Sequence, residues 1–149
     1  TDPNRWQGMD SLARGLNPLT ISRENGIRIE TQKGYVPPPL VGIWARYPYF
    51  HNNSVPTLCA LLTPASKRPK NYWSGEAIDR ETDFDSECVG YPLGDRVPDA
   101  WTRKPQHLFD TTRPGLSNSG HDAGIFVKEG VEIFTREDKR ELIEFLKTL

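Results

Sequence analysis

The chain has 149 residues, with 19 basic and 20 acidic side chains, a net charge of −1 and a hydrophobic fraction of 36%. Its length allows one domain with a moderate core, but 13 prolines, 12 glycines and the low hydrophobic fraction exclude a fold built of long regular helices throughout. The evenly mixed charge gives no basic patch for nucleic acid or an anionic membrane, and no apolar run reaches the roughly 18 residues of a membrane-spanning helix.

The N-terminal part of the chain is predicted to be largely irregular. The stretch SLARGLNPL (11–19) favours a short helical turn that ends before Pro18. Apolar and polar residues alternate over 26–36, which predicts a short strand or an extended arm, and YVPPPL (35–40) forces an extended, polyproline-like backbone. The chain starts at TDPNRW without a methionine or a signal-like segment, so we expect it to have been trimmed or excised from a longer polypeptide.

The middle of the chain begins with its densest apolar segment, residues 40–62. LVGIWAR predicts a short helix, YPYFHNNS a turn, and SVPTLCALL a second helix with Ser54 as its N-cap and Pro56 in its first turn. From 74 to 120 no regular element of any length is indicated, although aromatic residues recur there. A loop this long is uncommon in a compact domain unless it packs on something, so we expect it to pack through its aromatic residues and not to be a disordered linker.

The end of the chain, residues 135–149, predicts an amphipathic helix. Thr135 and Asp138 resemble a capping box at its start. An apolar stripe at helical spacing follows, formed by Leu142, Phe145, Leu146 and Leu149. The expected fold is therefore mainly α with long irregular loops, a single segment over 1–149 that this helix closes.

The two cysteines, Cys59 and Cys88, are too far apart for a CxxC metal or redox motif. They form either one disulfide in an oxidising compartment or two buried free thiols. The sequence leaves both alternatives open.

One histidine, His121, stands among small residues in LSNSGHDAGIF (116–126). Small neighbours let the backbone approach a large flat group, and an imidazole nitrogen is a ligand of haem iron. The alternative is an ordinary surface loop in which His121 is exposed or hydrogen-bonded to Asp122. A lone histidine is a weak signal, so the residues alone favour the surface loop.

Three further residues are candidates for contacts with a cofactor. His51 lies on an aromatic turn, where it could bind a haem propionate; alternatively it is a packed histidine satisfied by the backbone. Trp44 and Arg46 suit stacking and an ion pair with a carboxylate or propionate, or are a core tryptophan and a surface arginine. The sequence contains no GxSxG nucleophile motif, EF-hand loop, phosphate-binding loop or dinucleotide-binding motif, so an independent hydrolase has no support.

Three blocks of the sequence together resemble one family. The blocks are LVGIWARYPYFHNNSVPTLCALLTPASKRPKNYWSG (40–75), FDTTRPGLSNSGHDAG (109–124) and REDKRELIEFLKTL (136–149). They resemble, in the same order, the C-terminal part of the di-haem cytochrome c peroxidase superfamily, in particular its rubber-oxygenase-like c-type cytochromes. The resemblance implies a partial cytochrome c-like domain, exported to the periplasm or secreted.

The resemblance also implies roles for the candidate residues. His121 would be the distal axial ligand of a haem c, and histidine there lowers the reduction potential relative to methionine. His51 would lie near the haem, and Trp44 and Arg46 would line the haem or its propionates. The backbone around Arg46 and Pro48 corresponds to a segment that helps to bind calcium in related peroxidases.

One feature of the family is absent, because the chain contains no CxxCH motif for haem attachment. We therefore expect a companion polypeptide, or an N-terminal part outside this sequence, to carry that motif; the alternative is a relative that has lost its haem. The complete protein would transfer electrons toward peroxide or oxygen chemistry, or only carry them, with a redox partner protein. This chain would not be catalytic alone.

The expected function is therefore to enclose a haem, supply its distal ligand and exclude water from it. The residues expected to exclude water are Trp44, Tyr49, Phe50 and Trp101. The rival hypothesis is a haem-free extracellular binding or scaffold module, in which His121 is a loop histidine and segment 74–120 is sensitive to proteases.

Overall fold

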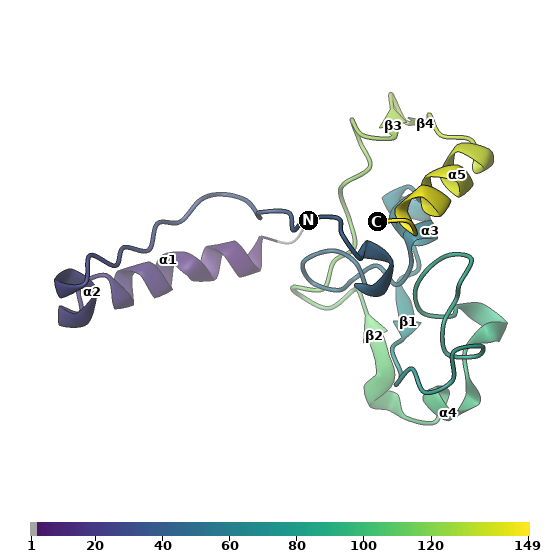
Figure 1. Ribbon diagram of the computed structural model, residues 1–149, viewed down its shortest axis with the longest axis horizontal. Coiled ribbons are helices and arrows are strands. Elements are labelled where there is room, and N and C mark those ends of the chain that lie inside the picture. Colours follow the sequence, from purple (N-terminus) through teal and green to yellow (C-terminus); the bar gives the residue numbers. More distant parts are fainter. Residues whose placement is uncertain (1–2) are drawn as a thin grey trace. The chain divides into compact units, whose positions relative to one another are not determined.

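The structure, a computed structural model, describes residues 3–149 (Figure 1). The contacts between Cα atoms divide it into two compact units, Asp2–Pro38 and Pro39–Leu149, here called the N-terminal and C-terminal units. In the part of the chain that the structure describes, no helix is both long enough and apolar enough to cross a membrane.

The N-terminal unit is a helical arm. Helix α1 (Asn4–Leu16) is longer than the helical turn predicted for 11–19, and it is followed by the short helix α2 (Thr20–Glu24). The chain then runs back without forming a strand, so the extended arm is the correct alternative for 26–36. The Asn17 side chain fixes this arrangement, because its amide accepts from the Ile29 N–H at 2.8 Å and donates to the Ile29 carbonyl at 2.9 Å.

The core of the C-terminal unit forms around an extended segment, residues 54–58, that is fully buried. Tyr49 and Val55 pair there as an antiparallel bridge, with N–H to oxygen distances of 2.7 and 3.3 Å. Because the bridge keeps the backbone extended, helix α3 (Leu58–Leu61) begins later than predicted, and Thr57 is its N-cap. The prediction of Ser54 as N-cap, with Pro56 in the first turn, is therefore wrong.

The remaining core residues come from both ends of the unit. One hydrophobic cluster contains residues from the segment around α3 and from later segments. Its buried members are Tyr49, Val55, Leu58, Ala60, Leu62, Val89 and Ile143. The unit thus joins the segment around α3 to the end of the chain.

Two small antiparallel sheets were not predicted. Strand β1 (Asn71–Trp73) pairs with β2 (Leu108–Asp110), and β3 (Val127–Lys128) pairs with β4 (Val131–Glu132). Strands of two or three residues leave no alternating pattern in the sequence. The fold is therefore mixed and rich in loops, so the expectation of a mainly α fold is confirmed only for the long irregular loops and the C-terminal helix.

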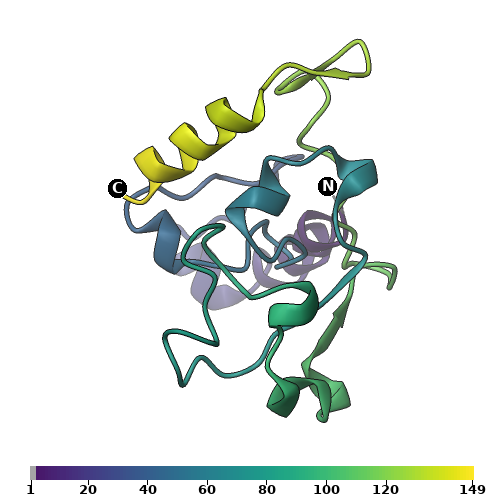
Figure 2. The same ribbon diagram turned by 90° about the vertical axis from the view of Figure 1, so that its right-hand side faces the viewer.

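The segment between β1 and β2 contains short helical turns but no long element, as predicted. These are the 3-10 turns η3 (Gly94–Arg96) and η4 (Pro105–His107) and helix α4 (Asp99–Thr102). Two further 3-10 turns lie earlier, η1 (Ile43–Ala45) and η2 (Ala65–Lys67). Figure 2 shows α4 and β2 (green) at the end of the unit opposite α5 (yellow).

The long segment packs on an aromatic cluster of its own. Trp101 is 5% exposed and meets the Tyr91 ring edge-on, with centroids 5.7 Å apart. Tyr91 stacks on Tyr72, which stacks on Phe109 at 5.0 Å. Gly75 makes room for this cluster, since a Cβ atom there would lie 2.1 Å from the Trp101 indole. The segment therefore packs on residues of this chain, which confirms the expectation that it is no disordered linker.

The C-terminal helix α5 (Arg136–Leu146) confirms the main prediction for this part of the chain. Thr135 and Asp138 form the capping box, with the Asp138 carboxylate accepting from the Thr135 N–H and hydroxyl at 2.7 Å each. Helix α5 packs on α3 (Figure 1) through buried Ile143 and partly buried Leu142 and Leu146.

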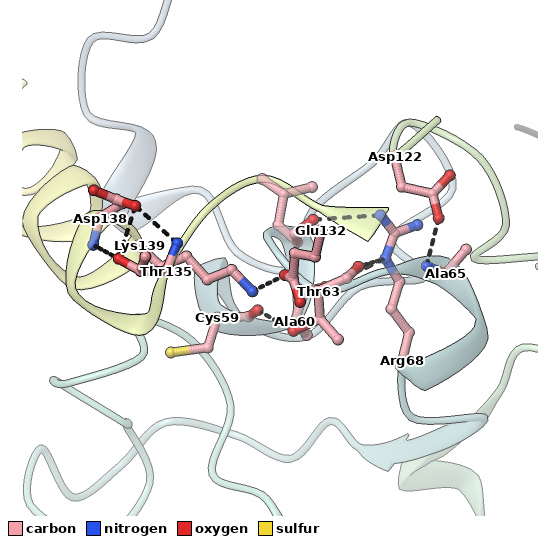
Figure 3. A network of polar contacts seen from close by, with 11 residues as sticks. Cys59, Ala60, Thr63, Ala65, Arg68, Asp122, Glu132, Thr135, Asp138 and Lys139 are labelled. Carbon is pink, nitrogen blue, oxygen red and sulfur yellow. Dashed lines mark hydrogen bonds and ion pairs between the residues drawn. The ribbon is translucent and has the colours of Figure 1, made fainter. Parts of the chain in front are cut away.

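The predicted apolar stripe of α5 is wrong for Phe145, which is 58% exposed. Ile143, which the stripe left out, is the most buried residue of the helix. Residues two apart on a helix point to nearly opposite sides, so burial of Ile143 turns Phe145 toward solvent. An ion pair of Lys139 with Glu132 joins α5 to β4 (Figure 3).

Cys59 and Cys88 form a disulfide, which decides between the two alternatives that the sequence left open. The bond joins α3 to the segment around Val89 across a sequence separation of 29 residues. No cysteine of residues 3–149 is left as a free thiol.

Removing the disulfide is expected to lower the free energy of unfolding by about 3–4 kcal/mol, because a closed loop of this length restricts the unfolded chain. Urea unfolding of the wild type with and without reductant measures the loss. The double variant Cys59→Ala/Cys88→Ala should match the reduced protein and should not respond to reductant. An oxidised midpoint that reductant leaves unchanged would contradict the disulfide.

The capping box predicts a pH dependence for α5. Hydrogen bonds from the Thr135 hydroxyl and N–H lower the pKa of Asp138 from its ordinary value. A carboxyl whose pKa is lower in the folded state stabilises the fold above its unfolded pKa, near 4, and loses this effect as the pH falls through the folded value. Amide exchange in α5 should therefore differ between wild type and Asp138→Asn at pH 7, and the difference should shrink by pH 3. An equal difference at both pH values would refute the role of the charge.

Candidate functional site

The loop that carries His121, residues 115–124, has no regular secondary structure and is held by side chains from another segment. Asn52 donates its amide to the carbonyl oxygens of Gly115 at 3.2 Å and Ser117 at 2.9 Å. Asn118 of the loop donates in turn to the carbonyl of Pro69 at 2.8 Å. The beginning of the loop is thereby fixed to residues 52–69.

Arg68 fixes the next part of the loop from the protein interior. It is 4% exposed, and its Nη1 donates to the carbonyl oxygens of Asn118 at 2.6 Å and Gly120 at 2.7 Å. Its other nitrogens donate, at 2.9–3.3 Å, to carbonyls of α3 and the residues just after it, those of Ala60, Leu61 and Thr63. Figure 3 shows the Arg68 side chain extended toward Thr63. One guanidinium therefore connects the end of α3 to the loop.

Asp122 fixes the loop on the far side of His121. Its Oδ2 accepts from the Ala65 N–H at 2.7 Å (Figure 3), and this hydrogen bond, above all other causes, lowers the pKa of the carboxyl. Burial lowers the pKa of Arg68, and the charge of Asp122 partly offsets that shift. A hydrogen-bonded carboxylate and a buried guanidinium thus hold the residues on either side of His121.

His121 itself is exposed and lies against Phe50, with ring centroids 5.0 Å apart. The guanidinium of Arg68 lies over the same phenyl ring, 5.1 Å from its centroid. Partial desolvation lowers the pKa of His121, and the charges of Arg68 and His51 lower it further, while Asp122 acts in the opposite direction. The surroundings therefore favour the neutral imidazole, the form that can donate a lone pair to a metal.

The two rings in contact both come from residues with unusual backbone conformations. Phe50 has φ 66° and His121 has φ 55°, in the left-handed region that non-glycine residues seldom adopt. Such conformations persist where the surrounding structure fixes them, and they are frequent at functional sites. The contact between two of them marks this place in the fold as a candidate site.

The structure brings together some of the predicted site residues and separates others. His51 is near His121, as their electrostatic interaction indicates, whereas Trp44 lines a different cavity of about 560 Å³ together with Tyr47 and Phe84. Trp44 is 45% exposed, and the exposed Arg46 donates to the carbonyl of Pro39 at 3.0 Å. A role for Trp44 and Arg46 beside a propionate stays a prediction.

The residues expected to exclude water also divide into two groups. Phe50 contacts His121, but Tyr49 and Trp101 belong to the core, each 5% exposed. Tyr49 donates its hydroxyl to the Val89 carbonyl at 3.2 Å, within that core. Of these residues, Phe50 has a described ring contact with His121.

Two residues of the site were missed by the sequence analysis, Asn52 and Arg68. Both lie in the block that resembles the cytochrome family, but no motif or spacing relates either to a loop some fifty residues later. The property that could have indicated them is chemical. The carbonyl groups of an irregular loop lack the regular backbone hydrogen bonds of a helix or sheet, so they need donors from side chains elsewhere in the chain.

Residues 3–149 include no group of three or more histidine, cysteine, aspartate or glutamate side chains that could hold a metal ion. The donor at this site is a single imidazole with small neighbours, and a Cβ atom added at Gly124 would meet nothing within 4 Å. One exposed imidazole suits a metal that brings further ligands of its own, as haem iron does. It does not suit a metal held by protein side chains alone, and the expected calcium stays a prediction.

A family model described as RoxA-like, cytochrome c-like, matches residues 34–74. This match includes Phe50, His51 and Arg68 and ends before His121. It shows that this part of the chain has a cytochrome c-like sequence.

The chain is also similar to two proteins of Sinorhizobium fredii (strain NBRC 101917 / NGR234), each described as uncharacterized. It is 42% identical to protein y4iJ over 130 residues, 86% of this chain and 20% of that protein. It is 35% identical to protein y4iM over 144 residues, 89% of this chain and 32% of that protein. The chain therefore spans between about a fifth and a third of the length of these relatives.

The left-handed backbone at His121 gives a stability prediction. The variant His121→Gly should be more stable to urea than His121→Ala by about 1 kcal/mol, because glycine adopts this conformation without a steric penalty while both variants lack the imidazole.

The matched control is Ser119, a neighbour in the same loop that is not among the described residues with positive φ. There Ser119→Gly should be less stable than Ser119→Ala. Equal stability of the two His121 variants would show that the loop does not hold the left-handed conformation in solution.

Proposed function

We propose that this chain encloses one face of a haem c and supplies His121 as the distal axial ligand of its iron. The observation that carries the proposal is the exposed imidazole, fixed against Phe50 on a loop whose neighbours on both sides are held by side-chain hydrogen bonds. The cytochrome c-like sequence over 34–74 supports it, because that match contains the residues that hold the loop.

The chain's own residues would each do a definite part of this work. Arg68 and Asp122 orient the loop, and Phe50 covers one face of the imidazole and limits its rotation. The surroundings of His121 favour its neutral form, which is the form of an imidazole that binds a metal. His51, which interacts electrostatically with His121, would pair with a propionate. A haem c, when bound, supplies a centre that accepts and donates one electron.

Attachment of the haem would come from outside this sequence. Cys59 and Cys88 are joined to each other, so neither can form a thioether bond to a haem. We propose that a CxxCH motif and the proximal histidine lie elsewhere in a longer polypeptide or on a companion chain. The disulfide supports an oxidising compartment, the periplasm or the extracellular space.

In the complete protein, this unit would serve electron transfer toward peroxide or oxygen chemistry, in exchange with a redox partner protein. Histidine as the distal ligand would keep the reduction potential lower than methionine would. The unit is not proposed to be catalytic alone.

The first test is an ultraviolet–visible spectrum of the native protein, oxidised and then reduced with dithionite. We expect a Soret band and, after reduction, sharp α and β bands of a low-spin haem. The variant His121→Ala should lose the low-spin spectrum and have a higher reduction potential, because the axial imidazole is gone.

The control variant is His107→Ala, which removes a histidine beside the β1–β2 pair and should leave the spectrum unchanged. Native protein that absorbs only through its tryptophan and tyrosine side chains would refute the proposal and leave the haem-free binding module as the better hypothesis.

A further inference from the structure

We propose that Arg68 is the positioning residue of this site: its guanidinium sets the direction in which His121 points by fixing the peptide group immediately before it. The inference rests on the proposed function of His121 and adds the residue that holds the His121 loop in one conformation.

The first step is the geometry of the guanidinium. Two of the carbonyl oxygens that accept from Arg68 belong to the His121 loop, Asn118 and Gly120, and the Nη1 distances are 2.6 and 2.7 Å. The other acceptors lie at the end of α3, where helix carbonyls lack partners within the helix. Arg68 is therefore tied to a rigid element and to the loop at the same time.

The second step is the position of the Gly120 carbonyl. It belongs to the same planar peptide group as the N–H of His121, so a hydrogen bond that fixes the carbonyl fixes one side of the His121 backbone. Asp122 fixes the other side through the Ala65 N–H. The left-handed φ of His121 is thus held from both directions, which leaves only the side-chain torsions to vary.

The third step is the contact with Phe50. The same guanidinium lies over the phenyl ring on which His121 packs, so Arg68 also fixes the surface that limits rotation of the imidazole. A lysine cannot replace these functions, because an ammonium is a single point donor without the planar fork that reaches several carbonyls.

The test compares Arg68→Lys with Arg96→Lys in the native haem protein. Arg96 forms an ion pair with Asp85 at 2.5 Å. Among the described hydrogen bonds and ion pairs, this pair has no contact with the His121 loop, so Arg96→Lys makes the same chemical change away from the site. Added imidazole competes with the axial histidine, and its apparent dissociation constant is read from the haem spectrum. We expect imidazole to bind at least 10-fold more tightly to Arg68→Lys than to wild type, with Arg96→Lys unchanged.

A second measurement does not depend on haem. Amide exchange of the 149-residue chain should become faster at residues 119–122 in Arg68→Lys, while α5 keeps its protection. A purely structural role would instead speed exchange throughout the C-terminal unit. If Arg68→Lys does not fold, ¹⁵N NMR of the wild-type guanidinium decides: Nη groups that rotate as freely as those of an exposed arginine would overturn the proposal.

The outcomes separate the two proposals. A wild-type haem ligated by His121, with equal competition in both lysine variants, would overturn the role of Arg68 and leave the proposed function standing. A wild-type protein without haem would overturn the proposed function, and with it the role of Arg68 toward a haem. Tighter imidazole binding to Arg68→Lys, together with faster amide exchange confined to residues 119–122, supports both.

Discussion

The structure of the C-terminal unit depends on one buried cation and the main-chain oxygens that surround it. In the hydrogen bonds described for residues 3–149, the donors of Arg68 go to carbonyl groups of two segments far apart in the sequence, and none goes to a carboxylate. A buried guanidinium is costly unless its donors are satisfied, and an irregular loop is unstable unless its acceptors are. The loop carbonyls satisfy the guanidinium donors, and the guanidinium in turn satisfies the loop carbonyls. A loop of small residues can therefore be rigid without secondary structure.

The features that could be predicted from the sequence are those determined by residues close together in the chain. The capping box of α5 and the turn-rich character of 74–120 are local properties, written in residues close together, and both are confirmed. The N-cap of α3 was misplaced because the bridge between Tyr49 and Val55 is a tertiary contact that delays the helix. The two-residue and three-residue strands had no periodicity from which to be predicted.

The candidate site shows the same division. His121 could be singled out because small residues surround it in the sequence, yet those residues alone favour a surface loop. Phe50, Asn52 and Arg68 come from an earlier block, and only the folded chain shows that they meet the loop. Conversely, Trp44 and Arg46 are near His51 in sequence, but Trp44 lines a cavity with Tyr47 and Phe84, and Arg46 donates to the Pro39 carbonyl.

The aromatic cluster around Trp101 bears on whether this part of the chain can fold without a cofactor. Because Tyr72, Tyr91 and Trp101 pack on one another, the segment that would otherwise depend on a cofactor has its own core. Folding of this segment would then require no haem, and the segment should resist proteases whether or not a haem is attached elsewhere in the complete protein.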